Sequence, residues 1–220
     1  MSDFSVARTN MVDGQIQTAG VVNPLVLQAF ETVPREKFVP AALQNVAYAG
    51  EDLPIGEGRF LLDPMIHARM IEAAAPNPAD VVLDIGGVSG YSAAILSYLA
   101  TTVVALEEKQ KYLSLAEKLW AELDVCNVVG IKGNLSKGNP ENAPFNLIFM
   151  NGSVSEIPEQ IAAQLAPDGR LITIVKKPGA VMGCVTLVQN TGDKGFSSYP
   201  LFEAGCPYLP GFEPGPVFSF

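Results

Sequence analysis

The 220-residue sequence is short of several residue types, and each shortage excludes a class of function. There is one histidine, His67, so multi-histidine metal sites are excluded and a Ser-His-Asp triad would depend on this residue alone. The three cysteines, Cys126, Cys184 and Cys206, are widely spaced and form no Cys-x-x-Cys pair. Neither a disulfide framework nor a zinc site is therefore indicated, and we expect no metal.

Basic residues are also few, with 14 Lys and Arg against 23 Asp and Glu, which gives a net charge of −9. This balance argues against nucleic acids and anionic membranes, because both require a clustered basic surface. The sequence has no apolar run of about 18 residues that would span a bilayer. The first ten residues, MSDFSVARTN, contain no apolar signal-peptide core. We expect a cytoplasmic protein, and the sequence leaves its oligomeric state open.

Hydrophobic residues are plentiful, at 48% against 17% charged, so the chain can build a sizeable core. From residue 81 onward, short β-type apolar runs alternate with helical patterns. This alternation predicts a parallel sheet with helices on both faces. The expected strands are 81–85, 102–106, 127–131, 145–150 and 170–175, and the expected helices are 91–100, 109–123 and 155–166.

The first 75 residues have a mainly helical pattern. Asn23-Pro24 and Asp63-Pro64 each combine an N-cap residue with a proline suited to the first helical position. Between them, the Gly- and Pro-rich segment 50–58 is expected to be an ordered loop.

The C-terminal part has a different pattern, since residues 180–190 and 195–204 flank the turn-rich TGDKG. This predicts an antiparallel hairpin at the sheet edge. The expected fold is a doubly wound, Rossmann-like α/β domain over residues 1–220, with a seven-stranded, mostly parallel sheet. We expect a helical N-terminal extension (1–75), a ligand-binding core (76–178) and a C-terminal hairpin and tail (179–220).

The stretch VVLDIGGVSGYSAA, residues 81–94, runs from a strand through a glycine-rich loop into a helix. Such a loop lets the backbone approach a ligand and presents the free N–H groups of a helix N-terminus. The glycines 86, 87 and 90 do not have the G-x-G-x-x-G spacing of dinucleotide-binding folds, so a nicotinamide enzyme is a weak hypothesis. Glu107 ends the next strand, where a carboxylate can accept hydrogen bonds from both ribose hydroxyls. The alternative is a solvated acid at a helix start.

Asp84-x-Gly-x-x-Ser-Gly-Tyr, then Glu107, Gly133-Asn134 and L-x-P-x-G-R-L, resemble class I S-adenosylmethionine-dependent methyltransferases. More narrowly, the chain resembles the protein-L-isoaspartate O-methyltransferase family over roughly residues 8–175. The stretches that carry this resemblance are MVDGQI (11–16), VPREKFVP (33–40), AYAGEDLPIG (47–56), DPMIHARM (63–70), VVLDIGGVSGYSAAIL (81–96) and NAPFNLI (142–148).

The resemblance implies S-adenosyl-L-methionine as cofactor and methyl ester formation on isoaspartyl carboxylates of damaged proteins. It implies cofactor contacts from Asp84, Gly86, Gly87, Ser89, Gly90, Glu107 and Asn134, and a substrate side at Ile55, Gly56 and His67. The chain departs from the family pattern at several positions. Leu62 and Phe60 stand for the Ser and Thr of a Thr-Ile-Ser-x-Pro segment, Val88 for a loop glycine, Asn134 and Asn146 for two aspartates, and Gly50 for an acid.

These departures leave two hypotheses open: a methyltransferase with an altered active site, or a catalytically degenerate family member that acts as a binding or scaffold protein. At Val88, a positive φ would strain the backbone, whereas a negative φ would leave only crowding near the cofactor. We also expect Trp120 in the core. Arg35 is expected in surface or capping contacts, with a substrate-side role as the alternative that the resemblance implies. His67 either bonds locally on a helix face or faces the cofactor loop.

Overall fold

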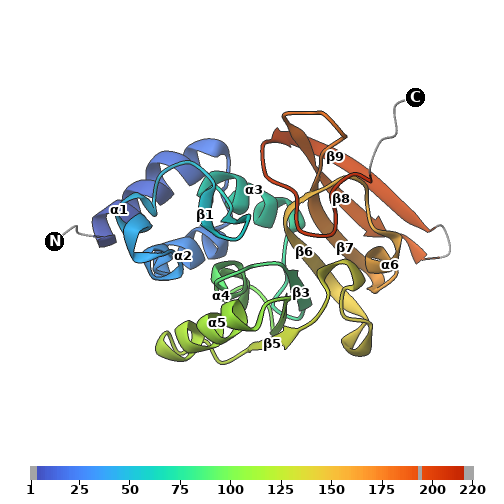
Figure 1. Cartoon of the computed structure of the whole chain (residues 1–220), viewed down its shortest axis with the longest axis horizontal. Coiled ribbons are helices and arrows are strands. Elements are labelled where there is room, and N and C mark those ends of the chain that lie inside the picture. The colour runs from blue at the N-terminus through green and yellow to red at the C-terminus, as the bar shows by residue number, and fades with distance from the viewer. Residues whose placement is uncertain (1–3, 193–194, 216–220) are drawn as a thin grey trace.

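The computed structural model describes residues 4–192 and 195–215, and its centre is a seven-stranded sheet in the order β5-β4-β3-β6-β7-β8-β9 (Figure 1). Strands β3 to β7 are parallel to one another, and β8 is antiparallel to both of its neighbours. The expected mostly parallel sheet with an antiparallel C-terminal hairpin is thus confirmed. The strands are β3 (Val81–Ile85), β4 (Thr102–Glu107), β5 (Val128–Lys132), β6 (Phe145–Val154), β7 (Leu165–Val175), β8 (Gly183–Asn190) and β9 (Phe196–Ala204).

Strand β3 is the point at which the order of the sheet reverses. It pairs with β4 on one side and with β6 on the other, so the chain leaves β3 in one direction and later returns to its opposite edge. In open α/β sheets, ligands bind beyond the carboxyl ends of the strands at such a switch point. The loop after β3 and the ends of β4 and β6 are therefore the parts of the fold that can form a site.

One face of the sheet is covered by α3 (Pro64–Ala74), α4 (Tyr91–Ser97) and α5 (Gln110–Glu122), together with the N-terminal helices. The opposite face packs against α6 (Glu159–Ala162), Leu135 of the 3₁₀ helix η5 (Leu135–Lys137), and Leu209 and Phe212 of the C-terminal tail. The 3₁₀ helix η6 (Pro140–Asn142) follows η5 and has no buried residue. Part of the opposite face is therefore covered by a C-terminal segment, whereas helices cover the first face.

The expected helix over 155–166 is wrong in length, because α6 has only four residues. Strand β7 already begins at Leu165, which pairs with Phe145, and a bulge follows before Leu147 pairs with Arg170. Asp168 lies in this bulge, in the left-handed region at φ 60°. The early return to strand pairing leaves no room for further helical turns.

The N-terminal segment is mainly helical, with the α-helices α1 (Phe4–Met11) and α2 (Pro24–Thr32). It also contains a π-helical turn, η1 (Val12–Ile16), and the 3₁₀ helices η2 (Gln17–Ala19), η3 (Arg35–Phe38) and η4 (Ala41–Val46). Both expected N-caps are confirmed: the Asn23 side chain accepts from the Leu25 N–H, and Asp63 accepts from those of Met65 and Ile66. None of the described helices is long and apolar enough to cross a membrane.

The expected loop at 50–58 is instead part of a β-hairpin, β1 (Leu53–Gly56) and β2 (Arg59–Leu61). Its turn is Glu57-Gly58, and both residues have positive φ, at 52° and 71°. Two consecutive left-handed residues form the kind of two-residue turn that matches the twist of a β-hairpin. Gly58 therefore belongs to a tight hairpin turn and not to an irregular loop. This hairpin brings Arg59 to the end of the main sheet.

Candidate functional site

The glycine loop after β3 has three residues in the left-handed region, Gly86 (φ 73°), Val88 (φ 53°) and Gly90 (φ 87°). Of the two possibilities open at Val88, the structure therefore has the strained one. A β-branched residue in this region stores about 1–3 kcal/mol that the surrounding structure must offset. Val88 is also 97% buried, since its relative exposure is 3%. The loop is held in a conformation that its own sequence disfavours.

Helix α5 packs against the glycine loop at Gly90. A Cβ on Gly90 would lie 2.7 Å from the Cβ of Ala116 and 2.7 Å from Cζ2 of Trp120, so only glycine fits there. The indole N–H of Trp120 donates a hydrogen bond to the Gly90 carbonyl at 2.9 Å. Trp120 is buried in the core as expected, and this hydrogen bond also makes it a direct contact of the loop.

Asp84 presents a partly unsatisfied carboxylate beneath the loop. Its Oδ1 accepts hydrogen bonds from the Ser92 hydroxyl and the Asn151 amide, both at 2.7 Å. Its Oδ2 has no hydrogen-bond partner among the described residues, nor has the buried hydroxyl of Ser89. Burial raises the pKa of Asp84 to about 6. The loop therefore encloses a free carboxylate oxygen and a free hydroxyl that a ligand could satisfy.

Glu107, at the end of β4, accepts four hydrogen bonds from protein groups. The Arg59 guanidinium pairs with both carboxylate oxygens, at 2.9 and 3.0 Å, and the Glu108 and Lys109 backbone N–H groups donate to Oε1. Arg59 and Glu107 are exposed by only 2% and 3%. The alternative of a solvated acid at a helix start is therefore wrong. Arg59 also donates to the Gly86 carbonyl at 2.9 Å, so it joins the ends of β3 and β4.

Arg59 was not among the predicted site residues, because the segment up to residue 58 was expected to be a loop. One signal was present: in the strand Arg-Phe-Leu, a charged residue shares the inward face with a buried leucine. An arginine on an apolar inward face requires an acidic partner. Glu107 is the acid that the fold brings to it.

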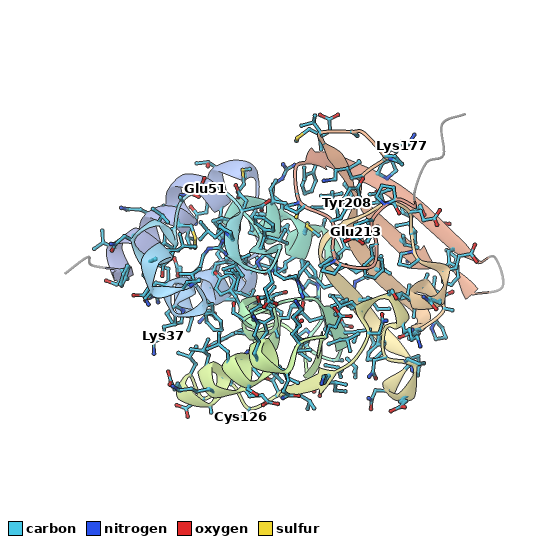
Figure 2. The ribbon with its side chains drawn as sticks, in the orientation of Figure 1. Lys37, Glu51, Cys126, Lys177, Tyr208 and Glu213 are labelled. Atoms are coloured by element: carbon cyan, nitrogen blue, oxygen red, sulfur yellow. The ribbon has the colours of Figure 1, made fainter. Side chains whose placement is uncertain are left out.

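The C-terminal tail closes the other side of the glycine loop. The Ser153 N–H donates to the Pro207 carbonyl and the Leu209 N–H donates to the Ser153 carbonyl, both at 2.9 Å, so the tail runs along the end of β6. Tyr208, labelled in Figure 2, lies in this tail. A Cβ on Gly86 would lie 2.9 Å from Cδ2 of Leu209. Leu209 thus fills the space directly in front of Gly86.

Little free space is left between these groups. The cavity against the loop measures about 10 Å³ and is bordered by Asp84, Val88, Glu107 and Trp120, among others. Sites for small molecules and cofactors usually have volumes of about 300–1,000 Å³. The polar groups converge beside this cavity, and on its far side Arg59 pairs with Glu107 while Leu209 lies against Gly86.

The remaining predicted residues are spread around this centre. Leu62 is buried just after β2, and its carbonyl accepts from Nη2 of Arg35 at 2.6 Å. Ile55 and Gly56 lie in β1, where the Gly56 carbonyl accepts from the Tyr112 hydroxyl at 3.1 Å. Asn134 is exposed and caps η5 through hydrogen bonds from the Ser136 N–H and hydroxyl.

His67 lies in the core rather than at the cleft surface. Its ring centre is 5.4 Å from that of Phe30, 5.8 Å from Tyr91 and 5.4 Å from Phe149. Neither ring nitrogen has a hydrogen-bond partner among the described residues, so the expected local hydrogen bond is not formed. Burial lowers the pKa of His67 to about 3. The histidine is therefore neutral and touches α4, which follows the glycine loop, through Tyr91.

The expectation of surface contacts for Arg35 is also wrong. Arg35 is fully buried, donates to the Ala47 carbonyl at 2.7 Å, and places its guanidinium carbon 5.1 Å from the centre of the Tyr91 ring. It joins the N-terminal segment to α4. In the described part of the chain, no group of three or more His, Cys, Asp or Glu side chains could hold a metal ion.

Comparisons with known proteins agree on one family. The protein-L-isoaspartate(D-aspartate) O-methyltransferase family matches residues 7–199. A protein-L-isoaspartate O-methyltransferase of Methylorubrum extorquens is 42% identical over 179 residues, which cover 80% of this chain and 77% of that protein. One from Koribacter versatilis is 38% identical over 178 residues, or 81% of this chain and 80% of the relative.

Solved structures show the same fold. A protein-L-isoaspartate O-methyltransferase superposes with a TM-score of 0.79 at 24% identity, over 93% of this chain and 66% of the other. A Plasmodium falciparum chain assigned to that family by name, in complex with S-adenosyl-L-homocysteine, gives a TM-score of 0.75 at 19% identity. That match covers 92% of this chain and 97% of the other.

Proposed function

Since the chain belongs to the protein-L-isoaspartate(D-aspartate) O-methyltransferase family, we propose that it transfers a methyl group to isoaspartyl carboxylates of proteins through an altered active site. S-adenosylmethionine is the methyl donor of this family, and the fold carries the corresponding Rossmann-like core. The observation that carries the proposal is the position of Glu107, which lies at the switch point beside the left-handed glycine loop. We place the activity in the cytoplasm, as the acidic composition favours.

The chemistry of the residues suits this cofactor. We propose that Glu107 accepts hydrogen bonds from its ribose hydroxyls, and that the glycine loop and the free Oδ2 of Asp84 lie along its amino acid part. When bound, the cofactor supplies an electrophilic methyl group. In this conformation Arg59 pairs with Glu107 and Leu209 lies against Gly86, so we propose that both move when the cofactor binds.

The acceptor side requires little from the protein in proton transfer. An isoaspartyl carboxylate is ionised at pH 7, so the reaction needs no general base. Its rate depends mainly on alignment and on exclusion of water. Leu62, buried at the position of the family serine, can exclude water but offers no side-chain hydrogen bond. We therefore propose a slowed transfer rather than a different reaction.

The second candidate is a binding or scaffold protein that no longer transfers methyl groups. Two observations favour it: the cavity of about 10 Å³ and the strained Val88 in the loop that should contact the cofactor. Neither removes Glu107 or the loop glycines, so methyl transfer is the leading proposal.

The test is methyl incorporation from labelled S-adenosylmethionine into a synthetic isoaspartyl peptide. The control substrate is the same peptide with an ordinary aspartyl residue, and the control protein is Glu107→Ala. We expect incorporation with the isoaspartyl peptide alone, reduced in the variant. Equal labelling of both peptides would contradict the proposed substrate, and no labelling together with tight cofactor binding would favour the second candidate.

A further inference from the structure

The buried ion pair between Arg59 and Glu107 points to control of cofactor binding by the protein itself. We propose that Arg59 is a positioning residue that competes with the cofactor ribose for Glu107, so that it must leave before the cofactor can be anchored. This inference rests on the proposed function, because it assumes that Glu107 is the ribose anchor.

The hydrogen-bonding capacity of Glu107 carries the argument. A carboxylate offers about four lone-pair positions, two on each oxygen. Oε1 already accepts three donors, namely Arg59 Nη1 at 2.9 Å and the N–H groups of Glu108 and Lys109 at 2.9 and 3.2 Å. Oε2 accepts Arg59 Nη2 at 3.0 Å. At most one further hydrogen bond fits, so a ribose with two hydroxyls cannot be held while Arg59 stays.

The second contact of Arg59 blocks the space as well as the acceptor. Nη2 donates to the Gly86 carbonyl at 2.9 Å and lies 3.1 Å from the position of a Cβ on Gly86. The guanidinium therefore bridges the ends of β3 and β4 across the switch point. Leu209 fills the adjoining side of Gly86. Gly86 is therefore covered on one side by the charged Arg59 side chain and on the other by the apolar Leu209 of the C-terminal tail.

Arg59 lies in a short hairpin, directly after an exposed turn. Strand β2 has only three residues and pairs with β1 alone, not with the main sheet. Its turn residue Glu57 is exposed and forms ion pairs with Lys109 and Lys111, so the hairpin touches the start of α5 through surface charges. Exposed ion pairs of this kind contribute little to stability. The strands themselves are anchored, since Leu53 and Leu61 are buried in the core. We therefore expect the Arg59 side chain and the adjoining turn, rather than the whole hairpin, to move when Arg59 withdraws from Glu107.

The experiment measures the affinity of the full-length protein for S-adenosylhomocysteine by calorimetry. The variants are Arg59→Gln, which removes the charge, and Arg59→Lys, which keeps it. Arg170→Gln is the control, because Arg170 forms a partly buried ion pair with Asp80 away from the cleft. We expect Arg59→Gln to bind at least about tenfold more tightly than the parent, Arg59→Lys to stay within about threefold, and the control within about twofold.

A merely structural role for Arg59 gives the opposite result, since an unpaired Glu107 would loosen the site and weaken binding. Equal or weaker binding by Arg59→Gln, with measurable binding by the parent, overturns this inference and leaves the proposed function intact. If neither the parent nor any variant binds the ligand, the proposed cofactor step fails, and this inference fails with it. In a Glu107→Ala background, Arg59→Gln should no longer tighten binding.

A second measurement applies if Arg59→Gln does not fold. It is a crystal structure of the parent protein with S-adenosylhomocysteine. We expect the nitrogens of Arg59 to lie beyond 4 Å from the Glu107 carboxylate, which is the limit of an ion pair, and the ribose hydroxyls to have taken their place. A ribose bound to Glu107 with the Arg59 pair unchanged would overturn the inference.

Discussion

Replacing Val88 by alanine and by glycine isolates the backbone strain in the glycine loop. Both variants lose the two methyl groups of valine, which border the small cavity. They differ in the last methyl group and in their tolerance of the left-handed backbone at φ 53°. Comparison of the two variants with each other, rather than with the parent, therefore cancels most of the packing change.

Three contributions set the expected difference in free energy of unfolding. Glycine is relieved of the left-handed penalty of about 1–2 kcal/mol that any L-residue bears. Against this stand about 0.4–1 kcal/mol for the greater freedom of glycine in the unfolded chain and at most about 0.8 kcal/mol for one lost methyl group. We expect the glycine variant to lie between about 0.8 kcal/mol less stable and about 1.6 kcal/mol more stable than the alanine variant. At an ordinary negative φ it would be about 1–2 kcal/mol less stable.

Urea unfolding followed by tryptophan fluorescence is a suitable assay, because the chain has one tryptophan and its indole is bonded to Gly90 of the same loop. Equal m values in the two variants would show that the comparison concerns the folded state. A glycine variant less stable than the alanine variant by more than about 1 kcal/mol would refute the positive φ at this position.

Three further predictions concern the cleft and its surroundings. Glu107→Ala should weaken calorimetric binding of S-adenosylhomocysteine by roughly tenfold, as expected for a charge-assisted hydrogen-bond pair; unchanged binding would contradict the ribose role. Val88→Gly should bind that ligand about tenfold more tightly, because the backbone strain is relieved. Adding Leu62→Ser should raise methyl transfer to an isoaspartyl peptide. Unchanged affinity and no transfer in the double variant would mean that the cleft is altered beyond these two positions. His67 has a folded pKa of about 3, below its unfolded value of about 6.5, so falling pH protonates the unfolded chain first. Relative to His67→Phe, the parent should lose about 2 kcal/mol of unfolding free energy between pH 7 and pH 5, and parallel pH profiles would show that His67 is not buried neutral.

The parallel core could be predicted because its pattern is local. Each expected strand from 81 to 175 is a short apolar run that alternates with a helical pattern. The order of the strands, with its reversal at β3, comes from the structure. Asn23 and Asp63 were found for a similar reason, since capping depends on neighbouring residues. The end of helix α6 was not predictable in this way, because the pairing of Leu165 with Phe145 overrides its helical pattern.

The residues of the candidate site could be predicted from the sequence, but the backbone conformation of the loop and the pairing of Glu107 could not. Asp84, Glu107 and the loop glycines follow from spacing after two strands. The φ of Val88 is not encoded in its own residue type, which disfavours the observed value, so only the fold reveals it. The pairing of Arg59 with Glu107 spans 48 residues and depends on a hairpin turn at Glu57-Gly58. Such a long-range contact is set by tertiary packing rather than by local pattern.

The most direct test of the account is a calorimetric titration of the parent protein with S-adenosylhomocysteine, repeated on Glu107→Ala. The account predicts measurable but weak binding by the parent, because the ligand must displace Arg59, and roughly tenfold weaker binding by the variant. Absence of binding in both the parent and the Arg59→Gln variant would contradict the claim that this cleft is a cofactor site.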